Sequence, residues 1–303
     1  MSRAGRILAA LALCLALASL TQALALPALA AAAELPEGFL ALPTRPGVTV
    51  PLAVISPERP RAVVILLAGG QGVVRISGRD NGRDNGHGNG HDKGHDGQAE
   101  IRNGGNFLVR SRQLFAAQGL AVLTMDVPSD HSDGMSAWFR FSPEHVADLR
   151  AVAAYARERW HLAPWLVGTS MGTISAARAA GMLPAEELGG VVLTSTIAKA
   201  AKRWDLPGAY QKGVLDAGLG TVRVPALVVR HRDDGCAFSA PEAGPRILDA
   251  LSASPRKALL TFEGGAPAQS EACEARSPHG YLGIEEQVVA GIAGFILNLD
   301  ARP

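Results

Sequence analysis

The stretch that decides the fold is Gly168-Thr169-Ser170-Met171-Gly172, which has the form G-x-S-x-G. The apolar run Pro164-Trp165-Leu166-Val167 before it predicts a strand, and the Ala-rich run 173–180 after it predicts a helix. Strand, sharp turn and helix are the setting of a nucleophile elbow, in which the serine hydroxyl stands above the sheet. The glycines are needed because side chains there would collide with the neighbouring strand and helix. The N–H of Met171, at the helix start, would point at a developing oxyanion.

A serine in this position needs an acid and a histidine further along the chain, in that order. The branched run 224–230 predicts a strand, and it leads into the polar loop His231-Arg232-Asp233-Asp234-Gly235. Because the acid belongs at the C-terminal end of such a strand, Asp234 is our first choice and Asp233 our second. The alternative for either is a solvated carboxylate paired with Arg232.

The histidine is expected in the long loop after the next strand, 256–262, because a side chain there can reach the serine hydroxyl and act as general base. That loop contains His279. His231 lies too close to the end of the acid's own strand to fill this role easily. His131, in the loop after the apolar strand 120–126, is a weaker rival. A plain surface histidine is the alternative for His279.

A second oxyanion donor is expected from an early strand-to-helix loop. The continuous apolar strand 62–67 ends in Ala68-Gly69-Gly70-Gln71-Gly72, whose glycines let backbone N–H groups approach a substrate. Gly70 or Gln71 is the expected donor. A phosphate-binding interpretation is weaker, because the loop lacks a G-K-[ST] ending and a G-x-G-x-x-G pattern before a helix.

These four features, in this order, resemble the α/β-hydrolase fold family from about Pro51 to the C-terminus, and most closely its small bacterial esterase-like members without a large cap. The alternation of apolar strands with helices, among them 106–118, a helix capped by Ser142, 241–251 and 284–297, predicts a doubly wound, mostly parallel α/β sheet. The resemblance implies hydrolysis of a small-molecule acyl substrate through an acyl-enzyme, without a cofactor or a metal. It does not fix the substrate, so ester, thioester, lactone and peptide all stay open. Two departures are a polar insert after the oxyanion loop and the Asp-Asp pair.

The chain has 303 residues and a formal net charge of +1. This length fits one large α/β domain over residues 34–303, and the charge gives no sign of a nucleic-acid surface. Residues 1–30 resemble a secretory signal, with arginines, then an apolar run, then Ala28-Leu29-Ala30, and cleavage is expected after Ala30 or Ala33. An uncleaved anchor helix is the rival interpretation. We therefore expect a periplasmic or secreted protein with no stable membrane partner after cleavage.

Two cysteines remain after such cleavage, Cys236 and Cys273. An even count in an exported chain predicts a disulfide, and this one would join the acid loop to the histidine loop. Two free thiols are the alternative. A cysteine nucleophile is less favoured, because neither residue follows a strand–turn–helix pattern.

Two segments stand apart from the regular alternation. Residues 197–221, where caps are usually inserted, are short enough for at most one helix over the pocket, and Trp204 and Tyr210 either line the acyl site or simply pack.

Residues 79–98 form a Gly-rich degenerate repeat with His87, His91 and His95 at intervals of four. Such a segment cannot bury apolar surface, so a solvated loop is favoured over a metal site. The alternatives to a hydrolase are a non-catalytic exported binding protein on this fold and a metal-binding protein that uses this repeat.

Overall fold

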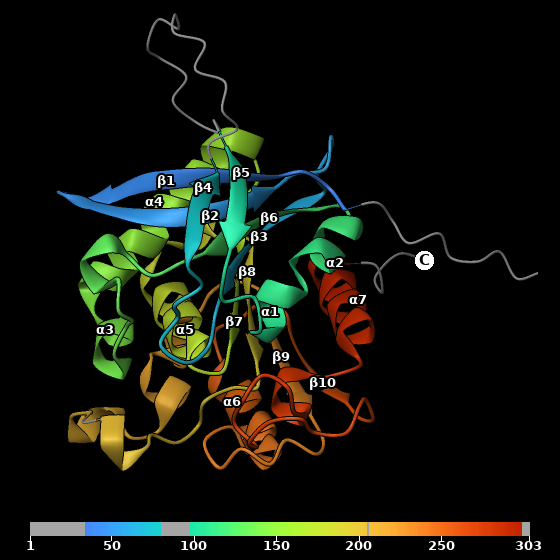
Figure 1. Ribbon diagram of the computed structural model, residues 1–303. Coiled ribbons are helices and arrows are strands. Elements are labelled where there is room, and N and C mark those ends of the chain that lie inside the picture. Colours follow the sequence, from blue (N-terminus) through green and yellow to red (C-terminus); the bar gives the residue numbers. More distant parts are fainter. Residues whose placement is uncertain (1–33, 80–96, 205, 299–303) are drawn as a thin grey trace, which may run out of the picture. The chain divides into compact units, whose positions relative to one another are not determined.

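The computed structural model describes residues 34–79, 97–204 and 206–298 of the chain. Within them, ten strands form one sheet in the order β10-β9-β8-β7-β3-β6-β2-β1-β5-β4 (Figure 1). The strands are β1 (Glu37–Arg45), β2 (Val48–Ile55), β3 (Ala62–Leu67), β4 (Ile76–Arg79), β5 (Gln98–Ile101), β6 (Leu120–Met125), β7 (Trp165–Thr169), β8 (Gly190–Thr194), β9 (Ala226–His231) and β10 (Lys257–Phe262). Neighbouring strands from β10 to β6 pair in parallel, and the pairs from β6 to β4 are antiparallel. The predicted mostly parallel sheet is confirmed.

The helices of the described residues lie on both faces of this sheet. They are α1 (Phe107–Arg110), α2 (Arg112–Ala117), α3 (Ala137–Phe141), α4 (Pro143–Trp160), α5 (Gly172–Met182), α6 (Gly244–Ala250) and α7 (Glu285–Ile296). Apolar residues of α1, α2 and α7 form one core cluster with one set of strand side chains, and those of α3 to α6 form the other. This doubly wound arrangement is the one predicted from the sequence.

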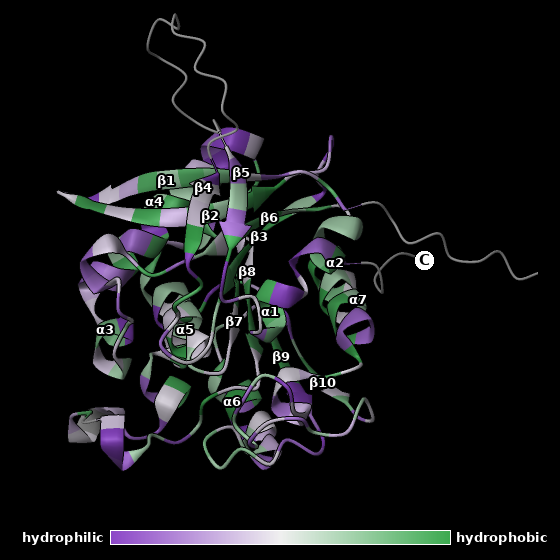
Figure 2. Ribbon diagram, in the orientation of Figure 1, coloured by the Kyte–Doolittle hydropathy of each residue, from purple (hydrophilic) through white to green (hydrophobic). Residues whose placement is uncertain are grey.

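The central strands are apolar along their whole length because both of their faces are buried. In β3, Val63, Ile65 and Leu67 belong to the core under α3 to α6, whereas Val64 and Leu66 belong to the core under α1, α2 and α7. Figure 2 shows these central strands as predominantly hydrophobic. Because successive side chains of a strand point to opposite faces of the sheet, the single apolar run of β3 contributes to both cores.

Helix starts follow ordinary capping chemistry. The Ser142 hydroxyl accepts a hydrogen bond from the His145 N–H, and Pro143 occupies the first position of α4, as predicted. The helix expected over 106–118 is instead two short helices, because Ser111 lies outside helical geometry between α1 and α2. Its N–H still donates to the carbonyls of Phe107 and Val109, so the chain turns there without losing that bond.

The segment between β8 and β9 carries a minimal cap. Its described residues form four short 3₁₀ turns, at Lys202–Trp204, Gly208–Tyr210, Gly213–Asp216 and Leu219–Thr221. The polar insert begins and ends in paired strands, with Arg79 of β4 opposite Gln98 of β5. The body of the insert, and residues 1–33 with the expected signal peptide, lie outside the described residues.

Candidate active site

Ser170 lies on the turn between β7 and α5 with a φ of 51°, in the left-handed region that a non-glycine residue rarely adopts. The two flanking glycines permit this turn. A Cβ on Gly168 would lie 2.4 Å from the carbonyl oxygen of Gly172, and a Cβ on Gly172 would lie 2.1 Å from the carbonyl oxygen of Leu67. The backbone of the predicted nucleophile elbow is therefore the one observed, with the half-buried serine at its apex.

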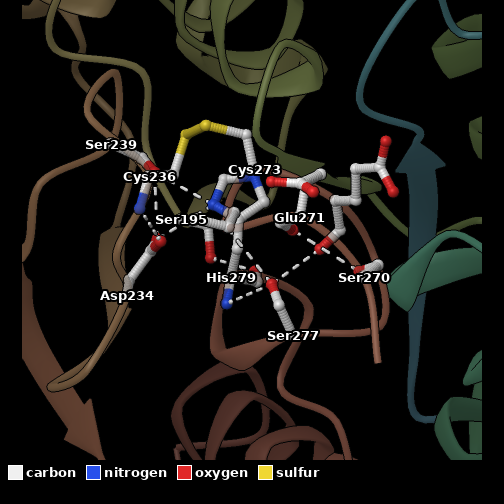
Figure 3. Close-up of a disulfide and its surroundings, with 11 residues drawn as sticks. Ser195, Asp234, Cys236, Ser239, Ser270, Glu271, Cys273, Ser277 and His279 are labelled. Atoms are coloured by element: carbon white, nitrogen blue, oxygen red, sulfur yellow. Dashed lines mark hydrogen bonds and ion pairs between the residues drawn. A yellow bond between two sulfur atoms is a disulfide. The ribbon is translucent and has the colours of Figure 1, made fainter. Parts of the chain in front are cut away.

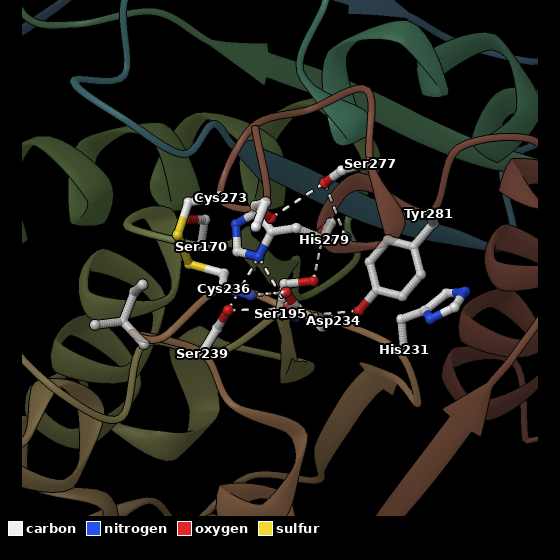
Figure 4. Close-up of polar contacts among 12 residues, drawn as sticks. Ser170, Ser195, His231, Asp234, Cys236, Ser239, Cys273, Ser277, His279 and Tyr281 are labelled. Atoms are coloured by element: carbon white, nitrogen blue, oxygen red, sulfur yellow. Dashed lines mark hydrogen bonds and ion pairs between the residues drawn. A yellow bond between two sulfur atoms is a disulfide. The ribbon is translucent and has the colours of Figure 1, made fainter. Parts of the chain in front are cut away.

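Asp234 and His279 lie in contact although 45 residues separate them (Figure 4). The imidazole Nδ1 is 2.9 Å from Asp234 Oδ2, and both side chains are buried. Asp234 Oδ1 accepts a hydrogen bond from the Cys236 N–H at 2.9 Å, which fixes the carboxylate. Asp233, the second choice for the acid, is exposed, and its N–H donates to His231 Nδ1. Arg232 pairs with Glu263 rather than with either aspartate.

The other imidazole nitrogen of His279 makes no hydrogen bond to any described residue, although it is buried. His279 and Ser170 line one cavity of about 600 Å³. Because Nδ1 donates to the carboxylate, the neutral ring presents the Nε2 lone pair as an acceptor. A buried acceptor that faces the same cavity as a serine residue is compatible with the role of a general base.

The rival histidines are engaged elsewhere. His231 is buried, with Nε2 3.0 Å from the carbonyl oxygen of Gly264 and Nδ1 accepting the Asp233 N–H. His131 lies 3.0 Å from Asp130 and stacks on Phe139 with ring centroids 3.6 Å apart. Both ring nitrogens of His231 are thereby occupied, and His131 is held by its own carboxylate.

Ser239 completes the contact between the acid and the histidine. Its hydroxyl donates to Asp234 Oδ2 at 2.9 Å, and its oxygen lies 3.0 Å from His279 Nδ1. Sequence reasoning missed this residue, since a serine in a polar loop carries no distinguishing signal. Its five-residue distance from Asp234 is the only feature that could have drawn attention to it.

The backbone around His279 is held from the end of β8. Ser195 Oγ donates to the His279 carbonyl at 2.6 Å, and the Ser195 N–H donates to the Tyr281 hydroxyl at 3.0 Å. That hydroxyl in turn donates to the Val229 carbonyl. Burial raises the pKa of Tyr281, so the phenol stays protonated and keeps this bond. Sequence analysis also missed Ser195 and Tyr281.

The glycine-rich loop after β3 packs directly against the elbow. A Cβ on Gly69 would lie 2.9 Å from Ser170 Cβ, so only glycine permits this approach. Gly70, Gln71 and Met171 line a second cavity, of about 470 Å³, on which Ser170 also opens. All the N–H groups expected to face an oxyanion therefore belong to residues around one cavity.

The two cavities differ in chemistry. The one with the candidate oxyanion donors has several apolar side chains, Met135, Ile197, Trp204 and Phe238, together with the cation Arg203, and we call it the apolar cavity. The other, which holds His279, has polar side chains that include Arg102, Asn103, Asn106 and Glu274. Trp204 thus lines the pocket and also contacts Phe238, with ring centroids 5.2 Å apart. Tyr210 packs instead against Trp138 and Phe141.

A disulfide joins Cys236 to Cys273, as predicted (Figure 3). Cys236 lies two residues after Asp234, and Cys273 six residues before His279. Both cysteines line the apolar cavity, and Cys273 also lines the polar one. The bridge therefore connects the two loops that supply the acid and the histidine, at the edge of the site.

The part of the chain that the structure describes contains no cluster of three or more His, Cys, Asp or Glu side chains able to hold a metal ion. His87, His91 and His95 lie outside it, so the metal interpretation of the repeat stays a hypothesis. Among the same residues, no helix is both long and apolar enough to cross a membrane.

Hydrolases are among the solved structures that resemble this chain. The esterase Pf2001 from Pyrococcus furiosus superposes with a TM-score of 0.58 at 13% sequence identity, over 87% of this chain and 91% of that one. A dienelactone hydrolase from Anabaena variabilis gives 0.55 at 14% identity, over 87% and 98%. An α/β serine hydrolase without a lid from Xanthomonas campestris gives 0.50 at 17% identity, over 85% and 95%.

This chain therefore has the α/β-hydrolase fold, in agreement with the resemblance drawn from its motifs. No protein-family model matches it, and no curated protein matches it. At these identities the likeness establishes the fold, and the chemistry rests on the site.

Proposed function

We propose that this protein is a serine hydrolase that cleaves an ester-type acyl bond through an acyl-enzyme intermediate. The observation that carries the proposal concerns His279, which lines a cavity with Ser170. Its buried Nε2 has no hydrogen-bond partner among the described residues, while its Nδ1 is held by Asp234. Elbow, base and acid come from three separate loops, each at the C-terminal end of a strand. The solved hydrolases of this fold support the general class.

In the proposed reaction, Ser170 Oγ attacks the carbonyl carbon and His279 Nε2 takes the hydroxyl proton. Asp234 keeps the imidazole oriented and stabilises its protonated form. The carbonyl oxygen becomes an oxyanion, which the N–H groups of Met171 and of Gly70 or Gln71 stabilise. Collapse breaks the bond to the leaving alcohol, which receives the proton from Nε2. A water molecule, activated by the same nitrogen, then attacks the acyl-enzyme and releases the acid and free Ser170.

The two cavities suggest where each part of the substrate binds. The leaving oxygen must lie within reach of the proton on Nε2, so the leaving group belongs in the polar cavity that His279 lines. The acyl group then occupies the apolar cavity with the oxyanion donors. An apolar acyl chain with a polar alcohol fits this division. With the disulfide between its loops, such an enzyme would suit a periplasmic or secreted location.

Fluorophosphonate labelling with peptide mass spectrometry tests the proposal. We expect one label per protein on Ser170, absent in Ser170→Ala and strongly slowed in His279→Ala. Ser252→Ala, at an exposed serine, and His131→Ala, at the rival histidine, serve as matched controls that keep the label. Failure of the folded wild-type protein to react would overturn the hydrolase proposal.

The rate of ester hydrolysis by variants of Asp233 and Asp234 then shows which of the two aspartates is the acid. Asp234→Asn should lower kcat by on the order of 10⁴-fold, because the imidazole loses the carboxylate that fixes its tautomer. Asp233→Asn, at an exposed carboxylate without a side-chain partner in the described residues, should stay within about threefold of wild type. The opposite pattern would reassign the acid. 4-Nitrophenyl esters of increasing acyl length provide the assay and test the apolar cavity at the same time.

A further inference from the structure

Arg140 is a buried cation directly behind the glycine-rich loop. It lies in α3, is 1% exposed, and forms no ion pair with any carboxylate of the described residues. Its Nη1 donates to the Ser175 hydroxyl at 2.9 Å, and its Nη2 donates to the carbonyls of Gly70 at 2.9 Å and Ala68 at 3.2 Å. Burial lowers its pKa to about 9, so the guanidinium is still charged at neutral pH. A charge buried at such cost, and compensated mainly by loop carbonyls, calls for a functional explanation.

The planarity of the peptide bond gives this contact a consequence for the oxyanion hole. In a trans peptide, the carbonyl oxygen and the following N–H point to opposite sides. Because the Gly70 carbonyl faces Arg140, the N–H of Gln71 faces away from Arg140. Gly70 and Gln71 line the apolar cavity on which Ser170 opens. The Gln71 N–H has no acceptor among the described residues.

The Gly69–Gly70 peptide is held by a turn rather than by Arg140, and the Gly70 N–H, like that of Gln71, has no acceptor among the described residues. The Gly69 carbonyl accepts the Gly72 N–H at 3.0 Å, which closes a tight turn around the Gly70–Gln71 peptide. Gly70 has a φ of 56° and Gly72 a φ of 83°. A Cβ on Gly72 would lie 2.9 Å from Arg140 Nη2, so this glycine also leaves room for the guanidinium. Loop and cation are thus fitted to each other.

We infer that Arg140 is the positioning residue of the oxyanion hole, and that Gln71 rather than Gly70 supplies its second N–H. The inference rests on the proposed function and deepens it, since it resolves the choice between the two donors. Arg140 acts through the Gly70–Gln71 peptide and does not touch substrate. The planar fork of the guanidinium holds two carbonyls and a hydroxyl together, which the single ammonium of lysine cannot reproduce. The Ser175 hydroxyl that accepts the bond from Arg140 Nη1 also lies 2.8 Å from His145 Nε2, and these two contacts help to fix the guanidinium.

Arg140→Lys and Arg140→Gln test the positioning role. Loss of one oxyanion donor, or its misplacement by about 1 Å, costs on the order of 100-fold in kcat, and we expect both variants to lose about that much while KM stays within about threefold. Affinity for a boronic acid, which forms a tetrahedral adduct on Ser170, should fall by a similar factor. The final stoichiometry of fluorophosphonate labelling should stay at one per protein while its rate drops.

Arg178→Gln is the matched control. Arg178 is half-buried, and its Nε donates to the carbonyl of Phe141, in the same helix α3 as Arg140, at 3.1 Å. Among the described residues it makes no hydrogen bond to the glycine-rich loop. Its kcat should stay within about threefold of wild type. Wild-type kcat in folded Arg140→Gln would overturn the positioning role. Wild-type kcat in Arg140→Lys would also overturn it, since charge alone would then suffice.

A measurement on the wild-type protein keeps the inference testable if those variants do not fold. The enzyme, labelled with ¹⁵N at glutamine and glycine, is compared by NMR before and after phosphonylation. We expect the Gln71 amide proton, assigned with Gln71→Asn, to move downfield in the adduct as it bonds the phosphoryl oxygen, and the Gly70 amide to move little. A shift at Gly70 without one at Gln71, or at neither, would overturn the inference. Absence of phosphonylation would instead overturn the proposed function.

Discussion

Removing the disulfide should destabilise the fold far more than it slows the reaction. The bridge closes a loop between residues 37 positions apart. For a loop of this length, the chain-entropy relation gives about 4 kcal/mol of stabilisation, through restriction of the unfolded chain. A domain is typically stable by about 5–15 kcal/mol, so this one bond would account for a large share of the total.

In the folded state, hydrogen bonds, and not only the disulfide, hold the proposed catalytic residues in place. Asp234 is held by the Cys236 N–H and the Ser239 hydroxyl, and the His279 carbonyl by the Ser195 hydroxyl. None of these bonds needs the sulfur atoms. While the protein stays folded, loss of the bridge should therefore lower kcat by no more than about tenfold, equivalent to about 1.4 kcal/mol in the barrier.

Urea unfolding of wild type and of Cys236→Ala/Cys273→Ala, followed by circular dichroism, measures the first quantity. Hydrolysis of a 4-nitrophenyl ester without denaturant measures the second. Wild-type protein under reductant provides a sequence-matched control, and peptide mapping without reductant verifies the bridge. A loss of unfolding free energy below about 1 kcal/mol would refute the entropy argument. Loss of activity at native circular dichroism would refute the independence of the catalytic contacts.

Two further predictions concern the elbow and the buried histidine. Gly172→Ala should destabilise by about 3 kcal/mol or more in urea unfolding, because its Cβ would meet the Leu67 backbone, whereas Gly294→Ala, in the open on α7, should be neutral or stabilising. Burial, and then the Arg140 charge, lower the pKa of His145 from 6.5 to about 3. Below pH 6.5 the unfolded chain binds a proton at this histidine that the folded chain does not bind. The free energy of unfolding therefore decreases as the pH is lowered, and this group accounts for a loss of about 3 kcal/mol at pH 4.5. The difference in unfolding free energy between wild type and His145→Gln should show that slope, and a pH-independent difference would contradict it.

The sequence was most informative where a strand is buried on both faces. Strands β2 and β3 begin and end where their apolar runs do, at Val48–Ile55 and Ala62–Leu67. The antiparallel strands β1, β4 and β5 were missed, since two of them are four residues long and β1 contains Gly38 and Pro43. Short edge strands carry too few residues for a periodic signal.

The residues of the candidate site also include some that the sequence pointed to and others that it did not. Ser170, Asp234 and His279 could be picked out because each follows a strand or a recognisable turn, and chain order limits their roles. Ser239 and Arg140 could not, because their importance arises from contacts with residues far apart in the sequence. Arg140 lies in a short helix whose sequence carries no distinguishing signal, and only its hydrogen bond to the Gly70 carbonyl draws attention to it.

The order of the strands explains why these supporting residues are needed. The histidine loop leaves β10 at the edge of the parallel strands, and it must pass β9 and β8 to reach the elbow at the end of β7. The end of β8 lies between acid and nucleophile, and there Ser195 binds the His279 carbonyl and the Tyr281 hydroxyl. This strand end supplies no reacting group in the proposed mechanism, yet it determines where the imidazole lies. In the proposed mechanism, the loops that follow β3, β7, β8, β9 and β10 therefore all contribute, either by chemistry or by placement.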